Sequence, residues 1–352
     1  MKIVFVIPSL GTGGAERIVS LLSKIFFKNG YEVYIIIFHE PIKYGYEGRL
    51  IDINVPHTSN FLKKPFIFLR RLFSIRTHIK AIKPDLIISF LETANIPTVF
   101  ANMGYKYKHI ISIQNNPDRF SFYHKWFLHF YRYAYKVVVV SNAIKHHMMD
   151  RYKMRNIEVI YNSINLEEID YMLKDKLPES IKIPYILMVG RLTYQKGIDI
   201  LIRAFYKAFK DAPVNLVIAG EGKDRFVLEQ LVKTLHLENK VFLIGNVQNP
   251  FILYKNALFL VLSSRWEGFA NVLVEALACS CPVIASNCPY GPSEVLEDGE
   301  YGILVPPEDE SALANAMKLM YENVELRKKF SEKAFRRAEA FDLKHIYKKW
   351  LI

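Results

Sequence analysis

The chain has 352 residues, 51% of them hydrophobic and 23% charged, and a formal net charge of +12. This composition excludes a disordered chain, and the length exceeds one ordinary core, so we expect two domains of about 170 residues each. No apolar run approaches the ~18 residues that a bilayer-spanning helix needs.

The positive charge is concentrated in the first half. Residues 1–165 contain 23 Lys and Arg against 10 Asp and Glu, a net +13, whereas the remainder contains 24 against 25, a net −1. This asymmetry predicts that the two halves have different partners. The three cysteines lie within ten positions and lack a Cys/His partner set for zinc, so we expect buried, reduced thiols in a cytoplasmic protein.

Both halves alternate short β-rich runs with amphipathic stretches, a pattern typical of doubly wound parallel sheets. We predict an α/β chain with a Rossmann-like domain at 1–165, a polar linker at 166–182 and a second Rossmann-like domain at 183–330. Residues 331–352 are predicted to form a C-terminal helix. The strand candidates are KIVFVI, YEVYIIIF, DLIISF, HIISI and KVVVV in the first half, and YILMVG, VNLVIAG, VFLIG, LFLVLS, PVIAS and GILVP in the second. Ligands are expected at the carboxyl ends of these strands.

A glycine-rich loop, GTGGAER at 11–17, follows the first strand and opens a helix. Closely spaced glycines let the backbone approach a phosphate or a sugar without interference from Cβ. A dinucleotide fingerprint is the rival interpretation, because Glu40 stands roughly where a ribose-binding acid would be. The pattern is GxGGAE rather than GxGxxG, however, and an NAD-dependent oxidoreductase would leave the motifs of the second half unexplained.

Two cations share one strand-to-helix loop in the second half. Arg191 and Lys196 follow the apolar run at 184–190 in the sequence RLTYQKG, and the amphipathic stretch IDILIRAFYKAF comes next. A strand, a short loop with two cations and a helix N-terminus place positive charge where a diphosphate can bind. Isolated loop cations are usually only solvated, so this interpretation depends on what else lies in the same half.

Two carboxylates flank the start of a later helix, in the sequence RWEGFANVLVEALA. The stretch from Asn271 to Cys279 has good helix formers and no Gly or Pro, which predicts a helix starting near Ala270 or Asn271. Glu267 then lies in the preceding loop and Glu275 about one turn inside the helix. Both acids can reach the helix N-terminus, whose free amides attract an anion. An anionic ligand with hydroxyls for carboxylates to bind is a nucleotide sugar; the alternative is a buried helix with incidental acids.

In order and spacing, IPSLGTGGAER, VGRLTYQKG, AGEG at 219–222 and EGFANVLVEALA resemble the family 4 retaining glycosyltransferases. The resemblance covers most of the chain. It implies the GT-B fold, in which two Rossmann-like domains flank an interdomain cleft and the last helix returns to the first domain. It also implies a nucleotide-sugar donor and transfer with retention at the anomeric carbon.

The resemblance implies a catalytic or donor-binding role for each candidate residue. Arg191 and Lys196 would bind the diphosphate and stabilise the leaving nucleoside diphosphate, so that no metal or other cofactor is needed. Glu275 would accept hydrogen bonds from the ribose, and Glu267, the third expected catalytic residue, from the donor sugar. For Glu221 a simple glycine turn is an equally good interpretation. The other donor-binding candidates are Gly13 and Gly14, then Gly245, Asn246 and Val247 beside the base, and Gly268, Phe269 and Ala270 through backbone amides.

The two glutamates are not interpreted as a hydrolase dyad, because glycosidases flank the scissile bond with both carboxylates and here one is assigned to the ribose. No Asp-x-Asp metal motif stands in a suitable loop, and we assign no nucleophile. Many family members carry a His close to the donor sugar, but the corresponding stretch here, ISIQNNP at 111–117, has none. Gln114 or Asn115 could supply a hydrogen bond there but could not take a proton near neutral pH.

Two segments of the first half combine cations with aromatic residues. Residues 61–83 contain seven Lys and Arg, four Phe and no acid, and residues 119–136 interleave Trp, Tyr and Phe with cations. Such composition suits the headgroup layer of an anionic membrane. It could also bind nucleic acid, but no nucleic-acid motif is present, and an aromatic core with solvated charge must account for part of both segments.

These features predict a cytoplasmic enzyme that is peripheral on the inner face of the cell membrane. It would transfer a hexose or N-acetylhexosamine from a nucleotide sugar, with UDP as the expected nucleotide. The resemblance extends to bacterial enzymes of O-antigen, capsule and lipid-linked oligosaccharide assembly and implies a polyprenyl-diphosphate-linked saccharide as the acceptor. A soluble acceptor, an NAD-dependent oxidoreductase and a non-catalytic membrane adaptor are the alternatives.

Overall fold

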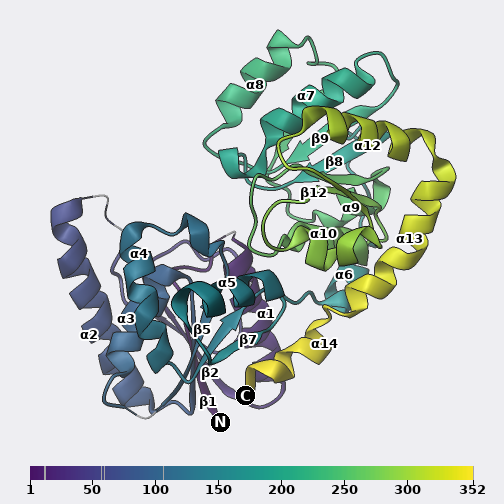
Figure 1. The fold of residues 1–352 in the computed structure, drawn as a ribbon. Coiled ribbons are helices and arrows are strands. Elements are labelled where there is room, and N and C mark those ends of the chain that lie inside the picture. Colours follow the sequence, from purple (N-terminus) through teal and green to yellow (C-terminus); the bar gives the residue numbers. More distant parts are fainter. Residues whose placement is uncertain (12, 57, 59, 106, 352) are drawn as a thin grey trace. The chain divides into compact units, whose positions relative to one another are not determined.

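The computed structural model describes residues 1–11, 13–56, 58, 60–105 and 107–351. It divides the chain into two compact units, the first formed by Met1–Ser163 with Leu343–Ile352 and the second by Ile164–Asp342 (Figure 1). The named strands of each unit pair in parallel, with helices between them in the sequence. The predicted α/β class with two doubly wound domains is confirmed.

Among the described residues, the sheet of the first unit has seven strands in the order β3-β2-β1-β4-β5-β6-β7. The order reverses between β1 and β4, since the chain runs from β1 to β2 on one side and from β4 to β5 on the other. At such a reversal the two following loops diverge and leave a crevice for a ligand. The strands are β1 (Lys2–Val6), β2 (Glu32–Ile37), β3 (Arg49–Asp52), β4 (Leu86–Phe90), β5 (Lys108–Ile113), β6 (Lys136–Val139) and β7 (Ile157–Val159).

Helices cover both faces of this sheet. Ile75 and Ile79 of α2 and Ala94 of α3 share one core with Ile87 of β4. On the opposite face the end of the chain packs against β4, where the ring of Trp350 lies 5.4 Å from that of Phe90. The helices of this unit are α1 (Gly14–Lys28), α2 (Lys64–Ile82), α3 (Glu92–Asn102), α4 (Phe122–Phe127), α5 (Asn142–Tyr152) and α14 (Leu343–Ile346), with 3-10 turns η1 (Phe61–Lys63), η2 (Pro117–Arg119), η3 (Leu128–Tyr133) and η6 (Tyr347–Leu351).

The sheet of the second unit has six described strands in the order β10-β9-β8-β11-β12-β13, and its order reverses between β8 and β11. Each strand is short and apolar, and β8 and β9 are buried over most of their length. The reversal therefore brings the loop after β8 next to the loop after β11. The strands are β8 (Tyr185–Val189), β9 (Asn215–Ala219), β10 (Val241–Gly245), β11 (Leu260–Leu262), β12 (Val283–Ser286) and β13 (Ile303–Val305).

Within the second unit, α7, α8 and α12 cover one face of the sheet, and α9, α10 and α13 cover the other (Figure 1). Helix α7 is strongly amphipathic: Leu201, Phe205 and Phe209 recur at helical spacing and are buried in the core. The helices are α6 (Leu166–Met172), α7 (Ile198–Phe209), α8 (Arg225–Thr234), α9 (Phe251–Asn256), α10 (Asn271–Ala278), α11 (Pro292–Val295), α12 (Glu310–Glu322) and α13 (Val324–Glu339), with 3-10 turns η4 (Tyr194–Lys196) and η5 (Glu297–Gly299). None of the described helices is both long and apolar enough to span a bilayer.

The compact units divide the chain at slightly different residues from the predicted domains. The segment 166–182, predicted as a linker, is counted with the second unit, because it contains α6 and is bonded to that unit. Asn249 Nδ2 donates to the carbonyl of Met172 at 2.8 Å, and Lys255 Nζ donates to that of Leu173 at 3.0 Å. The predicted C-terminal helix at 331–352 is also divided between the two units: residues 331–342 belong to the second, whereas Leu343–Ile352 belongs to the first.

One glycine fixes how closely the two loops at the β8–β11 reversal approach each other. Gly197 has φ +59°, and a Cβ at this position would lie 2.2 Å from the carbonyl oxygen of Ser263. A side chain there would be both conformationally strained and in direct collision with backbone. The loop after β8 therefore packs against the loop after β11 with no room for any residue but glycine.

We expect Gly197→Ala to destabilise the second unit by about 3 kcal/mol or more, because it combines positive-φ strain with a backbone clash. Gly299→Ala is the matched control: its φ is +101° but no atom lies within 4 Å of the added Cβ. It should cost only about 1–2 kcal/mol, from backbone strain alone. Urea unfolding followed by far-ultraviolet circular dichroism measures both, and equal losses would contradict the proposed close contact.

Candidate functional site

The loops that follow β8 and β11 are joined by hydrogen bonds at the carboxyl ends of their strands. The backbone amide of Arg265 donates to the carbonyl of Gln195 at 2.8 Å, and Gln195 Nε2 donates to the carbonyl of Trp266 at 3.0 Å. Ser263 Oγ donates to the carbonyl of Lys196 at 2.9 Å. The residues between the two strands and their following helices, α7 and α10, thus form one connected structure.

A buried ion pair lies at the centre of these loops. Lys196 Nζ is 2.6 Å from Glu267 Oε1, and the two residues are only 9% and 5% exposed. Ser264 Oγ donates to the same carboxylate oxygen at 2.5 Å. Because a buried charge is costly unless it is paired and hydrogen-bonded, each member of the pair stabilises the other in this position. The two predicted catalytic residues are therefore in contact, although 71 positions separate them in the sequence.

The other predicted cation has a different environment. Arg191 is exposed, and its guanidinium has no ion pair or hydrogen bond to the residues that the structure describes. It precedes Leu192, which is fully buried, so the loop backbone at this point is fixed while the side chain is free. One cation of the loop is thus already paired, and the other remains available to an anion.

Arg265, which is not among the predicted site residues, links several segments of this region. The guanidinium of Arg265 donates to both carboxylate oxygens of Asp199, at 3.0 and 2.8 Å, and to Glu308 at 2.8 Å. It also donates to the carbonyl of Tyr194 at 2.7 Å and lies 3.8 Å from the centre of that ring. Burial by itself would raise the pKa of Asp199, but the hydrogen bond and charge of Arg265 outweigh it and hold that pKa below its usual value.

The second predicted carboxylate lies inside α10. The helix begins at Asn271, which confirms the predicted start, and Ala270 before it has a left-handed conformation with φ 71°. Glu275 is 6% exposed and accepts a hydrogen bond from the hydroxyl of Tyr254 at 2.9 Å. Phe269 directs its ring into the unit, 5.6 Å from that of Phe341. Gly268, Phe269 and Ala270 are all buried, so the Phe269 ring is not available to a ligand.

The candidates after β9 and β10 also lie together. Glu221 forms an ion pair with Arg225, and Arg225 donates to the carbonyl of Leu243 at 2.9 Å. Gly245 has φ +76°, and a Cβ there would lie 3.1 Å from the Glu221 carboxylate. The structure thus brings Glu221 next to Gly245, with Asn246 exposed and Val247 partly exposed beside them. Glu221 has a structural partner already, which the sequence pattern did not indicate.

In the first unit, Gly13 caps α1 and Gly14 is its first residue. The carboxylate of Glu16 folds back over Gly13, where a Cβ would lie 2.2 Å from Glu16 Oε2. Glycine at this position lets an acid lie against the helix N-terminus, whose free amides favour negative charge. Gly13 and Gly14 belong to a different unit from the candidates at 191–275.

The two amides considered in place of the family's histidine differ in the structure. Gln114 is 8% exposed, and its Nε2 donates to Ser112 Oγ at 2.7 Å. Asn115 is exposed. Of these two side chains, only Asn115 is therefore presented at the carboxyl edge of the first sheet.

No group of three or more His, Cys, Asp or Glu residues in the described part of the chain is arranged to hold a metal ion. All three cysteines are buried free thiols. Burial, followed by the charge of Glu267, raises the pKa of Cys288 to about 12. This thiol therefore stays protonated near neutral pH and is a poor nucleophile.

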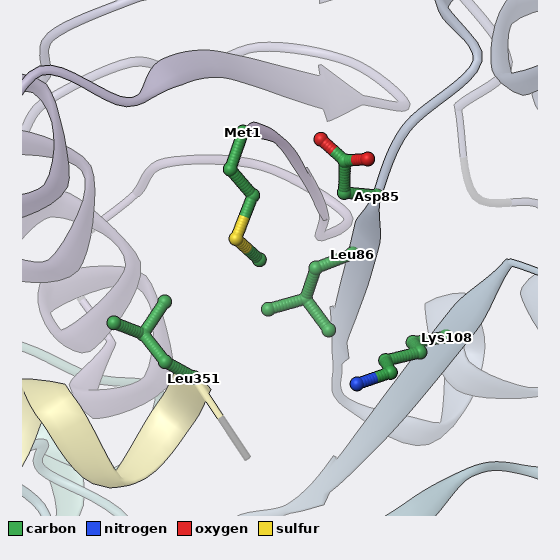
Figure 2. Close-up of a pocket in the computed structure, with 5 residues that line it drawn as sticks. All are labelled: Met1, Asp85, Leu86, Lys108 and Leu351. Carbon is green, nitrogen blue, oxygen red and sulfur yellow. The ribbon is translucent and has the colours of Figure 1, made fainter.

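Figure 2 shows a cavity of about 550 Å³ in the first unit, lined by Met1, Asp85, Leu86, Lys108 and Leu351. Its strand residues stand at the beginnings of β4 and β5. The cavity therefore lies at the amino edge of the sheet, opposite the edge at which open α/β sheets bind ligands. It contains none of the predicted site residues.

Comparison with known proteins identifies the family. Glycosyltransferase Family 4 matches residues 12–168, and Glycosyl transferases group 1 matches residues 173–337. The chain is 33% identical to the Campylobacter jejuni N-acetylgalactosamine-N,N'-diacetylbacillosaminyl-diphospho-undecaprenol 4-alpha-N-acetylgalactosaminyltransferase, over 97% of this chain and 96% of that protein. It is 31% identical to a second Campylobacter jejuni enzyme, the GalNAc-alpha-(1->4)-GalNAc-alpha-(1->3)-diNAcBac-PP-undecaprenol alpha-1,4-N-acetyl-D-galactosaminyltransferase, over 100% and 97%.

Solved structures agree on the fold. A glycosyltransferase from Rickettsia africae superposes with a TM-score of 0.81 at 25% identity, covering 99% of this chain and 96% of that one. Anabaena HepE in complex with UDP and glucose superposes with a TM-score of 0.81 at 21% identity, covering 99% and 98%. The two parallel sheets, the strand-to-helix loops and these matches have one common explanation: the chain is a glycosyltransferase of family 4 with the GT-B fold.

Proposed function

We propose that this glycosyltransferase transfers a hexose or N-acetylhexosamine from a UDP-sugar, with retention at the anomeric carbon, to a saccharide carried on polyprenyl diphosphate. The observation that carries the proposal is the buried Lys196–Glu267 pair, whose lysine shares the loop after β8 with the exposed Arg191. This arrangement offers two cations to a diphosphate and a carboxylate to the sugar attached to it.

The donor diphosphate would bind to Arg191 and Lys196. An ammonium has three N–H donors, so Lys196 can keep its bond to Glu267 and still donate to a phosphate oxygen. Arg191 supplies a planar guanidinium suited to bidentate phosphate contacts. As the bond to the sugar breaks, negative charge grows on the leaving diphosphate, and the two cations would stabilise it without a metal ion.

The two acids would hold the sugars of the donor. Glu267 has one oxygen bonded to Lys196 and Ser264, and carboxylate lone pairs remain to accept hydroxyls of the transferred sugar. Glu275, oriented by Tyr254, would accept from the ribose. HepE, which shares this fold, is solved with UDP and glucose, so UDP is the nucleotide to test first.

The acceptor is proposed from the relatives. The names of both Campylobacter jejuni enzymes describe N-acetylgalactosaminyltransferases whose substrates are saccharides on diphospho-undecaprenol. We carry that acceptor class to this chain, which implies work at the cytoplasmic face of the cell membrane. A soluble acceptor is the competing possibility, and vesicle binding separates the two.

One surface of the first unit suits contact with such a membrane. We call it the α2–α4 surface: the exposed side chains of Leu62 in η1 and Phe66, Leu69 and Phe73 in α2 recur at helical spacing, and α4 carries the further exposed side chains of Phe122, Tyr123 and Trp126. Phe68 of α2 lies 6.1 Å from Phe127 of α4, which joins the two helices. Residues 61–83 have seven cations and no acid, so an anionic bilayer is the complementary partner.

Changing the two cations tests the catalytic part of the proposal. We expect Arg191→Ala and Lys196→Ala each to lower kcat for UDP-sugar transfer by about 10²–10³-fold, since each removes stabilisation of the leaving diphosphate. Only Lys196→Ala should also destabilise the fold, by roughly 3 kcal/mol, because it leaves Glu267 buried without its partner. Turnover of radiolabelled UDP-sugars onto short lipid-linked acceptors, with thermal unfolding in parallel, measures both effects.

Lys318→Ala on the exposed side of α12 is the matched control and should change neither quantity. Near-normal turnover of Arg191→Ala would remove the diphosphate role from that residue. Activity that depends on added divalent metal would contradict the metal-free mechanism, and inversion of the product anomer in its NMR spectrum would contradict retention.

The α2–α4 surface can be tested on lipid vesicles. The double variant Phe66→Ser/Phe73→Ser should bind vesicles containing phosphatidylglycerol at least about tenfold more weakly than the parent, since two exposed rings no longer enter the interface. Leu319→Ser, which replaces a 51% exposed residue of α12, is the control and should bind like the parent. Equal binding by the double variant, or no preference for anionic over neutral vesicles, would refute this surface.

A further inference from the structure

Helix α13 packs along α10, the helix that carries Glu275. Near the middle of α13, Ser331 Oγ donates to the carbonyl of Ser280, just beyond the end of α10, at 2.8 Å. Just after α13 ends, the ring of Phe341 lies 5.6 Å from that of Phe269, which stands just before α10 begins. The two helices therefore run antiparallel, and the end of α13 lies at the beginning of α10.

A buried ring supports the loop before α10. Phe341 is 1% exposed and meets the ring of Phe269 edge to face, with an angle of 70° between their planes. Its backbone amide donates to the carbonyl of Ala338 at 2.9 Å, and its carbonyl accepts from the amide of Ile164 at 3.0 Å. Phe269, which follows Glu267 by two positions, thus packs against a ring whose backbone is bonded on both sides.

The last turn of α13 carries a cation that joins this ring to another helix. The guanidinium of Arg337 lies 4.8 Å from the centre of the Phe341 ring. It donates to the carbonyl of Val295 at 2.8 Å and to that of Glu294 at 2.7 Å, and it pairs with Glu297 at 2.5 Å. A planar guanidinium can reach all three oxygens at once. One side chain therefore connects the end of α13 with the end of α11.

The segment that leads into α11 touches the backbone of the same loop. Gly291 has φ +99°, and a Cβ there would lie 2.5 Å from the carbonyl oxygen of Phe269. The amide of Val295 donates to the carbonyl of Gly291 at 2.8 Å. By bonding to the end of α11, Arg337 therefore also holds the segment that packs on the loop at 267–270.

We propose that Arg337 and Phe341 are positioning residues for the donor site: together they hold the loop at 267–270, and with it the Glu267 carboxylate and the start of α10, in the geometry that binds a nucleoside diphosphate. The inference rests on the proposed function for the identity of that ligand. Neither side chain contacts the ligand, because Phe341 is buried and the Arg337 guanidinium is bonded to α11 and Glu297. Their effect is exerted through Phe269 and α11.

The loop needs such support. It contains Gly268, which restricts the backbone little, and Ala270, whose φ of 71° is a strained conformation for a residue with a side chain. Strained conformations persist only where the surrounding structure enforces them. If the support weakens, the loop adopts other conformations, and a ligand then has to order it again, which lowers the affinity.

The test compares Phe341→Leu with Phe330→Leu. Phe330 also belongs to the α13 segment, is 8% exposed and shares a core with residues of α7 and α12. Both changes remove a buried ring and should lower the thermal stability similarly. Only Phe341→Leu should raise the Kd for UDP, by about fivefold, as measured by isothermal titration calorimetry. An equal rise in Phe330→Leu would reflect a general loss of stability and overturn the proposal.

Hydrogen–deuterium exchange of the ligand-free protein tests the loop directly. The amides at 268–272 should exchange about tenfold faster in Phe341→Leu and in Arg337→Lys than in wild type, but not in Phe330→Leu. Arg337→Lys keeps the charge beside Glu297 and loses only the planar group, so it remains a test if Phe341→Leu does not fold. Unchanged exchange at 268–272 in the folded variants overturns the proposal.

A double-mutant cycle tests the path through Phe269. Phe269→Leu, Phe341→Leu and the double variant should have similar Kd values for UDP, because each removes the same ring contact. Effects that multiply in the double variant would refute this path. Faster loop exchange in Phe341→Leu, in an enzyme whose wild type does not bind UDP, would support the positioning of the loop and count against the proposed function, so the two failures differ.

Discussion

The buried contact between Lys196 and Glu267 is the constraint on which the second unit depends. The two residues come from loops after different strands, and neither charge could be buried alone without a cost of several kcal/mol. The contacts around this pair hold the two loops together. Gly197 permits backbone contact, the serines after β11 bond the lysine carbonyl and the glutamate, and Arg265 bonds to α7 and to the loop before α12. Under the proposed function, this packing places the Lys196 ammonium and the Glu267 carboxylate where a diphosphate and its attached sugar would bind.

The two sheets share a topology, and this explains why acids stand in related places. In each, the order reverses beside the first strand, so the loops after β1 and β4 in one unit, and β8 and β11 in the other, diverge around a crevice. Glu92 follows β4 and Glu267 follows β11. The difference is their partner. Glu267 pairs with an ammonium, whereas Glu92 has no ion pair among the described residues, and burial raises its pKa to about 7.

The parts of the fold and of the candidate site that depend on local sequence patterns could be predicted from the sequence. Continuous apolar runs indicated the strands other than β3 and β7, and the absence of Gly and Pro predicted a helix start near Ala270 or Asn271, where α10 begins at Asn271. What the sequence could not indicate were pairings between distant segments: Arg265 with Asp199, Tyr254 with Glu275, and α6 with α9 all join residues that have no common local pattern. Gln114 and Asn115 are chemically alike, and only the structure shows that Gln114 bonds inward to Ser112 while Asn115 is exposed.

The contrast between the two cations of the β8 loop has a consequence for how a donor would bind. Lys196 is preorganised, because Glu267 and the surrounding serines fix it before any ligand arrives, and no rotamer freedom is lost when a phosphate binds. Arg191 is exposed and must be ordered by the ligand. A lysine suits the first role, since its three donors point in different directions and can serve a carboxylate and a phosphate at once. In the proposed reaction, Lys196 therefore sets the position of the diphosphate and the arginine closes on it afterwards.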